Sequence, residues 1–255
     1  MDRRTFLTLT GTGLLTGIAG CSGDASETTT TGGGGEQTTA AATTSSTPSK
    51  TETETATETA TPTGEAAVTA TKEATLQVKE GDYTTKAWAE AELTNKGDAP
   101  SGQLQVDVRF YDADDNILST ETGYLATLGP GETWRAFIPL FGGDAKNADH
   151  VEAEGKFSKD PPAVRDGVTV AESSLSGGDT DKVVSTGIVE NGSDREISYL
   201  EAITKFYAGD GVVVNTEFSN IDGLPAGETW KFEHTYLRQY APAVTDHTVV
   251  LNENI

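Results

Sequence analysis

The sequence has few cysteines, few basic residues and few aromatic residues. Its 255 residues include one cysteine, Cys21, and 18 Lys and Arg against 40 Asp and Glu, which gives a formal net charge of −22. A single cysteine forms no disulfide within the chain, so the fold must be held by its core alone. The negative charge repels the phosphates of nucleic acids and anionic lipid headgroups, which excludes a nucleic-acid-binding protein.

Long hydrophobic runs are also absent. The apolar stretch from Leu7 to Ala19 is interrupted by three glycines, and it is shorter than the roughly 20 residues that a membrane-spanning helix needs. The stretch therefore predicts a signal peptide over residues 1–20. Arg3 and Arg4 precede Phe-Leu in this segment. This pair resembles a twin-arginine export signal, an address that is read by a receptor and that delivers folded proteins.

The signal peptide ends in Ile18-Ala19-Gly20-Cys21, which resembles a lipobox. In such a sequence the cysteine thiol is alkylated by lipid and the preceding peptide bond is cut, so Cys21 would be the lipidated first residue of the mature protein. The alternative is a plain cysteine at the end of a signal peptide. Together the two motifs predict a protein attached through lipid to the extracellular face of the cell membrane.

Residues 21–65 are predicted to form the lipidated N-terminus and a disordered stalk rich in Thr, Glu and Gly. Between residues 24 and 64 there is no aromatic residue and no Val, Ile, Leu or Met, while 16 of the 41 positions are Thr. Such a segment buries too little apolar surface to offset the entropy of an ordered backbone. As a flexible coil it reaches roughly 35 Å. It is either a spacer that lifts a globular part off the membrane or an inert linker.

From residue 66 onward, short alternating apolar runs are separated by Gly, Asp and Asn clusters, which predicts an all-β fold. One pattern occurs twice, displaced by 96 positions. Asn95, Phe110-Tyr111, Leu128 and Gly131-Glu132-Thr133-Trp134 recur as Asn191, Phe206-Tyr207, Leu224 and Gly227-Glu228-Thr229-Trp230. We predict two tandem immunoglobulin-like β-sandwich domains, over residues 66–158 and 168–255, joined by a short linker over residues 159–167.

Each copy is expected to contain six strands. They are predicted over residues 74–79, 85–94, 103–111, 116–124, 132–140 and 149–157, and again over residues 168–175, 182–190, 197–208, 211–218, 228–237 and 246–252. In the third strand, apolar residues from Leu104 to Phe110 alternate with polar ones, which predicts one buried and one wet face. Tyr111 and Tyr207 are expected on the wet face beside Arg109 and Lys205, as a carbohydrate or protein contact or as a cross-strand pair.

These residues carry a family resemblance. The first copy contains Val108-Arg109-Phe110-Tyr111-Asp112, then a turn, then Leu128-Gly129-Pro130-Gly131-Glu132-Thr133-Trp134. This pattern resembles the FxLYD domain, a small β-sandwich of prokaryotic surface lipoproteins. Val108 stands where the family has Phe, and the second copy has Thr204 and Ala208 in place of Phe and Asp. The resemblance implies fold and location but no catalytic residues.

The acidic composition, the export signal and the Thr-rich stalk together resemble surface lipoproteins of halophilic archaea. In such proteins dense carboxylates keep the surface hydrated where salt screens most of their repulsion.

The sequence contains no motif of a known catalytic site. No Gly-x-Ser-x-Gly, His-Glu-x-x-His or phosphate-binding Gly-x-x-x-x-Gly-Lys sequence occurs. His150 and His247 belong to different copies, His234 is expected at a core or edge position, and the one thiol is assigned to lipid, which leaves too few ligands for zinc. We therefore predict no enzymatic activity and no cofactor, with calcium as the one candidate ion.

Two short patterns are candidate ligand or modification sites. Asp112, Asp114 and Asn116 offer alternating oxygen ligands for Ca²⁺, although the glycine and glutamate of a full calcium loop are missing. The alternative is an ordinary hairpin turn. Asn191-Gly192-Ser193 matches the acceptor sequence for N-glycosylation, and Asn191 is predicted to lie in a turn.

The sequence therefore predicts a lipid-anchored, extracytoplasmic, non-catalytic protein that presents two immunoglobulin-like domains as a binding or structural module. Its expected partners are the membrane, through lipid on Cys21, and an unidentified extracellular protein or glycan. Two other interpretations stay open. One is an accessory subunit of a membrane transport or respiratory complex, and the other is a hydrolase with an acidic site between the domains.

Overall fold

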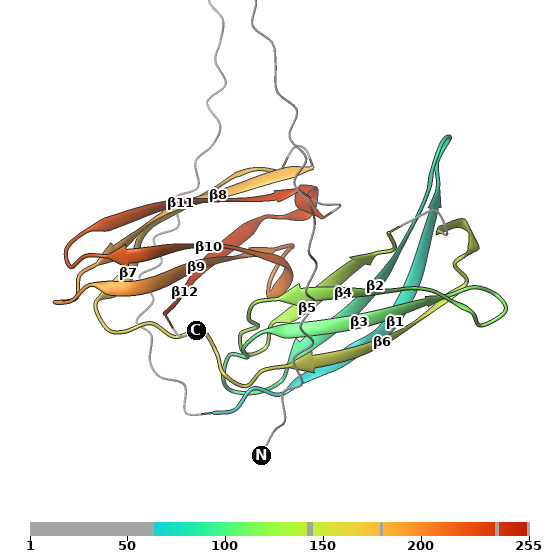
Figure 1. Ribbon diagram of the computed structural model, residues 1–255, viewed down its shortest axis with the longest axis horizontal. Coiled ribbons are helices and arrows are strands. Elements are labelled where there is room, and N and C mark those ends of the chain that lie inside the picture. Colours follow the sequence, from blue (N-terminus) through green and yellow to red (C-terminus); the bar gives the residue numbers. More distant parts are fainter. Residues whose placement is uncertain (1–63, 142–144, 179–180, 238–239, 254–255) are drawn as a thin grey trace, which may run out of the picture. The chain divides into compact units, whose positions relative to one another are not determined.

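The computed structural model describes residues 64–141, 145–178, 181–237 and 240–253, so the predictions for Arg3, Arg4, Cys21 and nearly all of the stalk lie outside the described residues. Figure 1 shows the strands and two short 3₁₀ helices, η1 (Ala145–Asn147) and η2 (Ala241–Ala243). The strands are β1 (Val68–Glu80), β2 (Thr85–Asn95), β3 (Leu104–Tyr111), β4 (Ile117–Leu125), β5 (Thr133–Pro139), β6 (His150–Phe157), β7 (Val168–Gly177), β8 (Lys182–Asn191), β9 (Ile197–Tyr207), β10 (Val212–Leu224), β11 (Thr229–Leu237) and β12 (Asp246–Asn252). Within these ranges no helix has the length and apolar content needed to cross a lipid bilayer.

The all-β prediction is confirmed, and most predicted strands end within a residue or two of the observed ones. The two large differences have physical reasons. β1 begins at Val68 and not at residue 74, because its first half pairs with β2 through two register shifts that break the alternation of side chains. β10 continues to Leu224 and not to residue 218, because its polar second half still pairs with β9 as far as Ile197.

Each repeat contains two three-stranded sheets. In the first repeat β1-β2-β5 and β4-β3-β6 are the sheets, and in the second repeat β7-β8-β11 and β10-β9-β12 correspond to them. One connection was not predicted from the sequence. Val212 and Val213 at the start of β10 pair in parallel with Thr133 and Trp134 of β5, which joins one sheet of each repeat into a six-stranded sheet.

Alternation along the strands places the core. In β3 the side chains of Leu104, Val106, Val108 and Phe110 are buried, while those between them are half-buried or exposed. They belong to the core of the first repeat, which also contains Trp134, Ile138 and, from the second repeat, Tyr207 and Val213. Trp134 is therefore a core residue. The second repeat has its own apolar clusters around Leu200 and Phe206.

The repeated asparagine has the same structural role in both copies. The Asn95 side-chain amide donates to the carbonyl oxygens of Ala99 (2.8 Å) and Leu128 (2.9 Å). The amide of Asn191 donates to the carbonyl oxygens of Arg195 and Leu224, each at 2.9 Å. Both side chains are fully buried. Each asparagine therefore satisfies two buried carbonyl groups of the loops around it, which explains why it recurs.

The two repeats fill one core position in different ways. In the first repeat Ala91 of β2 lies opposite Ala136 of β5. At the equivalent pair of the second repeat, Gly187 of β8 lies opposite Phe232 of β11, and a Cβ on Gly187 would overlap the Phe232 ring. The Phe232 ring fits because Gly187, the residue opposite, has no side chain. The space that a side chain at Gly187 would fill is occupied by the ring.

Candidate functional site

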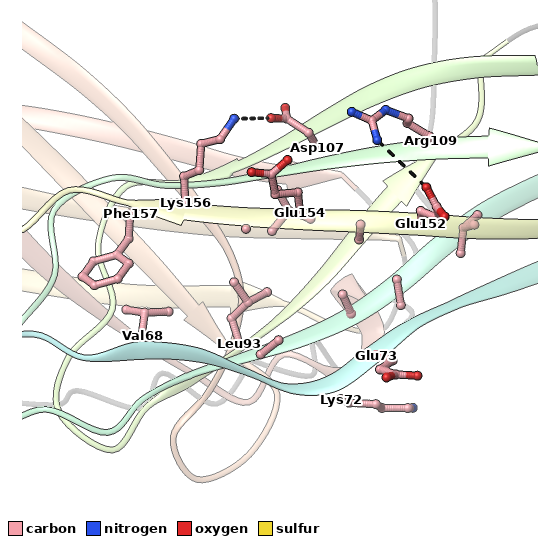
Figure 2. A pocket seen from close by; sticks show the side chains of 17 residues that line it. Val68, Lys72, Glu73, Leu93, Asp107, Arg109, Glu152, Glu154, Lys156 and Phe157 are labelled. Carbon is pink, nitrogen blue, oxygen red and sulfur yellow. Dashed lines mark hydrogen bonds and ion pairs between the residues drawn. The ribbon is translucent and has the colours of Figure 1, made fainter. Parts of the chain in front are cut away.

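An open groove lies along the first repeat between the edge strands β1 and β6. Its volume is about 540 Å³. Figure 2 shows Val68, Leu93 and Phe157 on one side of β6, where with Val106 they supply apolar contact area. The space exists because the inward-facing residues nearby are small: Ala91 in β2 and Ala153 and Gly155 in β6. Larger side chains at these positions would fill it.

The rim of the groove is charged and contains two ion pairs. Lys156 Nζ lies 3.1 Å from Asp107 Oδ2, and Arg109 Nη1 lies 4.0 Å from Glu152 Oε2. Figure 2 marks both ion pairs with dashed lines. A hydrogen bond from Gln105, with further donors from Thr122 and Lys156, lowers the pKa of Asp107. A general acid needs the opposite shift. The groove therefore offers an apolar floor and an ionic rim suited to contact with a partner.

The candidate calcium residues form a hairpin turn. Asp112 Oδ1 accepts hydrogen bonds from the backbone amides of Asp114 (3.0 Å) and Asn116 (2.9 Å), and the Asn116 side chain donates to both carboxylate oxygens. These bonds, first of all the one from the Asn116 side chain, lower the pKa of Asp112. The Asp112 carboxylate, which the calcium hypothesis requires as a ligand, therefore accepts hydrogen bonds from amide groups of its own turn. Within the described ranges no group of three His, Cys, Asp or Glu could hold a metal ion. The geometry agrees with the hairpin-turn interpretation.

Asn191 is not presented to solvent as a glycosylation acceptor. It is the last residue of β8, its side chain is fully buried, and its amide nitrogen donates the two hydrogen bonds described above. Ser193 donates through its hydroxyl to Asn191 Oδ1 at 2.6 Å. The acceptor sequence thus coincides with a structural hydrogen-bond cluster, so the folded repeat argues against glycosylation at this position.

His234 of β11 lies in the core of the second repeat, one of the two positions, core or edge, that the sequence left open. Its ring nitrogens contact the hydroxyl groups of Thr204 (2.8 Å) and Ser219 (2.9 Å). Burial lowers its pKa to about 4. A histidine next to a serine is one part of a nucleophilic site, but here the third partner is a threonine and the ring is enclosed, so the cluster is a buried polar network. His150 is at the surface, stacked on Tyr111 at 4.8 Å.

The prediction for Tyr207 and Lys205 was wrong: both side chains are buried. They lie on the outer face of β9, where the turn before β5 of the first repeat covers them. Glu132 of that turn accepts hydrogen bonds from Lys205 Nζ (2.8 and 2.9 Å) and from Tyr207 Oη (2.7 Å). Burial, followed by the nearby Glu132 charge, raises the pKa of Tyr207. We call this contact, together with the β5–β10 pairing, the inter-repeat joint.

Tyr111, the equivalent residue in the first repeat, meets the cross-strand prediction. Its hydroxyl donates to Glu152 Oε2 of β6 at 2.8 Å, and Arg109 contacts the same carboxylate. The joint itself was missed from the sequence. The available signal was the pair Val212-Val213, which stands where the first repeat has Asn116-Ile117.

No family model matches the sequence, and no curated protein matches it. Among solved structures, the chain is similar to red sea bream transglutaminase, with 9% identity and a TM-score of 0.21 over 65% of this chain and 27% of that one. It is also similar to a Bacteroides uniformis β-glucuronidase, with 12% identity and a TM-score of 0.19 over 73% of this chain and 28% of that one. A calcium-binding mutant of B. uniformis β-glucuronidase 2 gives 13% identity and a TM-score of 0.19, with 67% and 28% covered. The chain thus spans less than a third of each of these proteins, and similarities at this level carry no argument about activity.

Proposed function

We propose that this chain is a lipid-anchored protein of the extracellular membrane face, whose two immunoglobulin-like repeats act as a non-catalytic binding or structural module. The twin-arginine pattern at Arg3 and Arg4, the lipobox ending in Cys21 and the resemblance to FxLYD domains support the location. The observation that carries the binding role is the groove between β1 and β6, with its apolar floor and charged rim.

The groove favours contact over catalysis. Its carboxylates include Asp107, whose pKa is lowered by hydrogen bonding, and Glu152, which is paired with Arg109 and Tyr111. A hydrolase with an acidic site needs one carboxyl group with a raised pKa beside a second carboxylate. Edge strands beside an apolar groove instead suit a partner that lies along the sheet edge.

The anchor is tested by fractionation. Cells producing the tagged protein, with and without Cys21→Ser, are extracted with mild detergent in native salt. The wild type is expected in the membrane fraction and the variant outside it, because the lipid is the attachment. Equal solubility of the two forms would refute the lipoprotein assignment.

The binding role is tested by the proteins that co-purify. Ala70→Glu places a charge on an exposed β1 position that lines the groove, and Thr69→Glu is the matched control, because neighbouring strand residues point to opposite faces. Companions lost only with Ala70→Glu locate the partner in the groove. Stoichiometric companions from a membrane complex favour the accessory-subunit interpretation. Companions kept by both variants would remove the groove from the proposal.

A further inference from the structure

The inter-repeat joint uses one surface of the first repeat and a different surface of the second. Because the repeats are alike, the second repeat also has an equivalent of the first surface and the first repeat an equivalent of the second. The joint covers neither of these two equivalent surfaces. In the joint, the first repeat contributes the edge strand β5 and the turn at Glu132, and the second repeat contributes the edge strand β10 and the outer face of β9. The equivalents are β11 with Glu228 in the second repeat, and β4 with the outer face of β3 in the first. β11 and β4 are each at the edge of their sheet among the described strands.

We propose that the chain associates with a second copy of itself head to tail, through an intermolecular copy of this joint. The Glu228 turn and the start of β11 of one molecule would contact Arg109, Tyr111 and the start of β4 of the next. Because the two surfaces differ, the contact is heterologous and can repeat from one molecule to the next. The proposal does not depend on the anchor, and its surface shares only Arg109 and Glu152 with the rim of the groove. A failed self-association would therefore leave the proposed function, which the Ala70→Glu experiment tests separately, untouched.

An exposed apolar side chain supports this assignment. Val213 of β10 is fully buried against the core of the first repeat. Its equivalent, 96 residues earlier, is Ile117 at the start of β4, which is 59% exposed. In an intermolecular copy of the joint, Ile117 would be covered as Val213 is covered within the chain.

The first repeat also preserves the backbone conformation of the residue that accepts the hydrogen bond in the joint. In the joint, the Thr133 amide donates to the carbonyl oxygen of Gly211 at 2.8 Å. Gly211 has a φ of 69°, and its equivalent Asp115 has a φ of 62°, the one positive value of a non-glycine residue in the described ranges. The first repeat thus keeps the left-handed conformation of the acceptor residue without glycine. On the donor side, the turns hold Gly131 at 77° and Gly227 at 78°.

The charges of the two surfaces are complementary, and two differences from the inter-repeat joint set the expected strength of the contact. Glu228 is exposed, and Arg109 replaces Lys205 as the cation beside a tyrosine. In the first repeat, however, Glu152 already contacts Arg109 and Tyr111, where the second repeat has Thr248. The contact between copies also lacks the packing of Tyr240 on Phe137, because the equivalent of Phe137 is Glu233. It should therefore be weaker than the joint within the chain.

Association is measured by sedimentation velocity of the full-length chain carrying Cys21→Ser, over a range of protein concentrations in high salt. We expect reversible, concentration-dependent growth. Glu228→Arg should weaken the association at least about tenfold, because the new arginine would face the Arg109 cation of the next molecule. Glu152→Thr, which introduces the residue of the second repeat, should strengthen it. If association depended only on the general repulsion between acidic molecules, both variants would associate more strongly, since each removes negative charge. This result would overturn the proposal.

Cross-linking tests the geometry. Asn116 and Thr229 are equivalent to Val212 and Thr133, which are paired in the joint. Two chains, one with Asn116→Cys and one with Thr229→Cys, are mixed in the Cys21→Ser background and oxidised. A disulfide dimer is expected from this mixture but not from Thr69→Cys mixed with Thr229→Cys, because Thr69 lies on the exposed strand β1. Equal yields in the two mixtures, or a chain that stays monomeric at every concentration, would refute the head-to-tail contact.

Discussion

Replacing Glu132 with Gln tests whether the two repeats form one energetic unit. The Glu132 carboxylate holds the ammonium group of Lys205 at 2.8 Å, and the two side chains are only 17% and 8% exposed. Gln has nearly the same shape, so the substitution removes the negative charge without opening a cavity. Lys205 would then be left as a buried cation with only neutral acceptors.

The expected loss of stability is about 3 kcal/mol, near the lower end of the values of about 3–5 kcal/mol found when one partner of a buried ion pair is removed. The lower end applies because the Gln oxygen still accepts a hydrogen bond from Tyr207 or Lys205. Glu228→Gln is the matched control: it makes the same chemical change at the equivalent exposed turn, and its effect should lie within about 0.5 kcal/mol of zero.

Urea unfolding, followed by circular dichroism and tryptophan fluorescence at a protein concentration low enough to prevent association, measures both values. The double variant Glu132→Gln/Lys205→Met should recover part of the loss, because it removes both charges together. If Glu132→Gln destabilises the protein no more than Glu228→Gln does, the ion pair does not stabilise the joint and the reasoning is refuted.

Two further predictions concern the second repeat. Gly187→Ala should destabilise the protein by about 1–3 kcal/mol in the same urea assay, because the new Cβ meets the Phe232 ring and the Glu172 carbonyl oxygen. In a Phe232→Ala background, which imitates the alanine pair of the first repeat, the same Gly187→Ala substitution should cost less, and an equal cost in both backgrounds would argue against the overlap with the ring. For His234, the pKa is about 4 in the folded protein against 6.5 for the free side chain. Its contribution is thus fully present above pH 6.5 and is lost as the pH falls toward 4, by up to about 3 kcal/mol. His234→Gln should flatten the decrease of the unfolding free energy over this pH range, and an unchanged slope would contradict it.

The strands could be predicted because alternation in this chain reflects burial on a single face. β3 and β5 have strictly alternating burial, and their predicted limits differ from the observed ones by one residue. In β1, alternation does not predict the whole strand. Its bulges around Ala70 and Lys72 shift the side chains from one face to the other, so no period of two extends over the first half of the strand.

Comparison of the two repeats indicates a structural role for Asn191 in place of glycosylation. Asn95 occupies the same position in the first repeat, but it is followed by Lys-Gly and so lacks the glycosylation acceptor sequence. An asparagine retained in both copies, with the acceptor sequence in only one, is better explained by a role that both copies share. The structure gives that role as hydrogen bonds to two buried carbonyl groups in each repeat.

The inter-repeat joint could not be read from either repeat alone, because both outer faces carry a cation beside a tyrosine. Arg109 and Tyr111 remain at the surface, whereas Lys205 and Tyr207 are buried. Which copy is covered depends on how the repeats are connected, and a local pattern has no information about this. The difference between the copies is informative: the covered face has Thr248 where the exposed face has Glu152. An acid supplied by the same repeat satisfies the cation of the exposed face, and an acid supplied by the neighbouring repeat satisfies that of the covered face. In this chain, the cation without an acidic partner in its own repeat, Lys205, lies at the position where the neighbouring repeat provides one, Glu132.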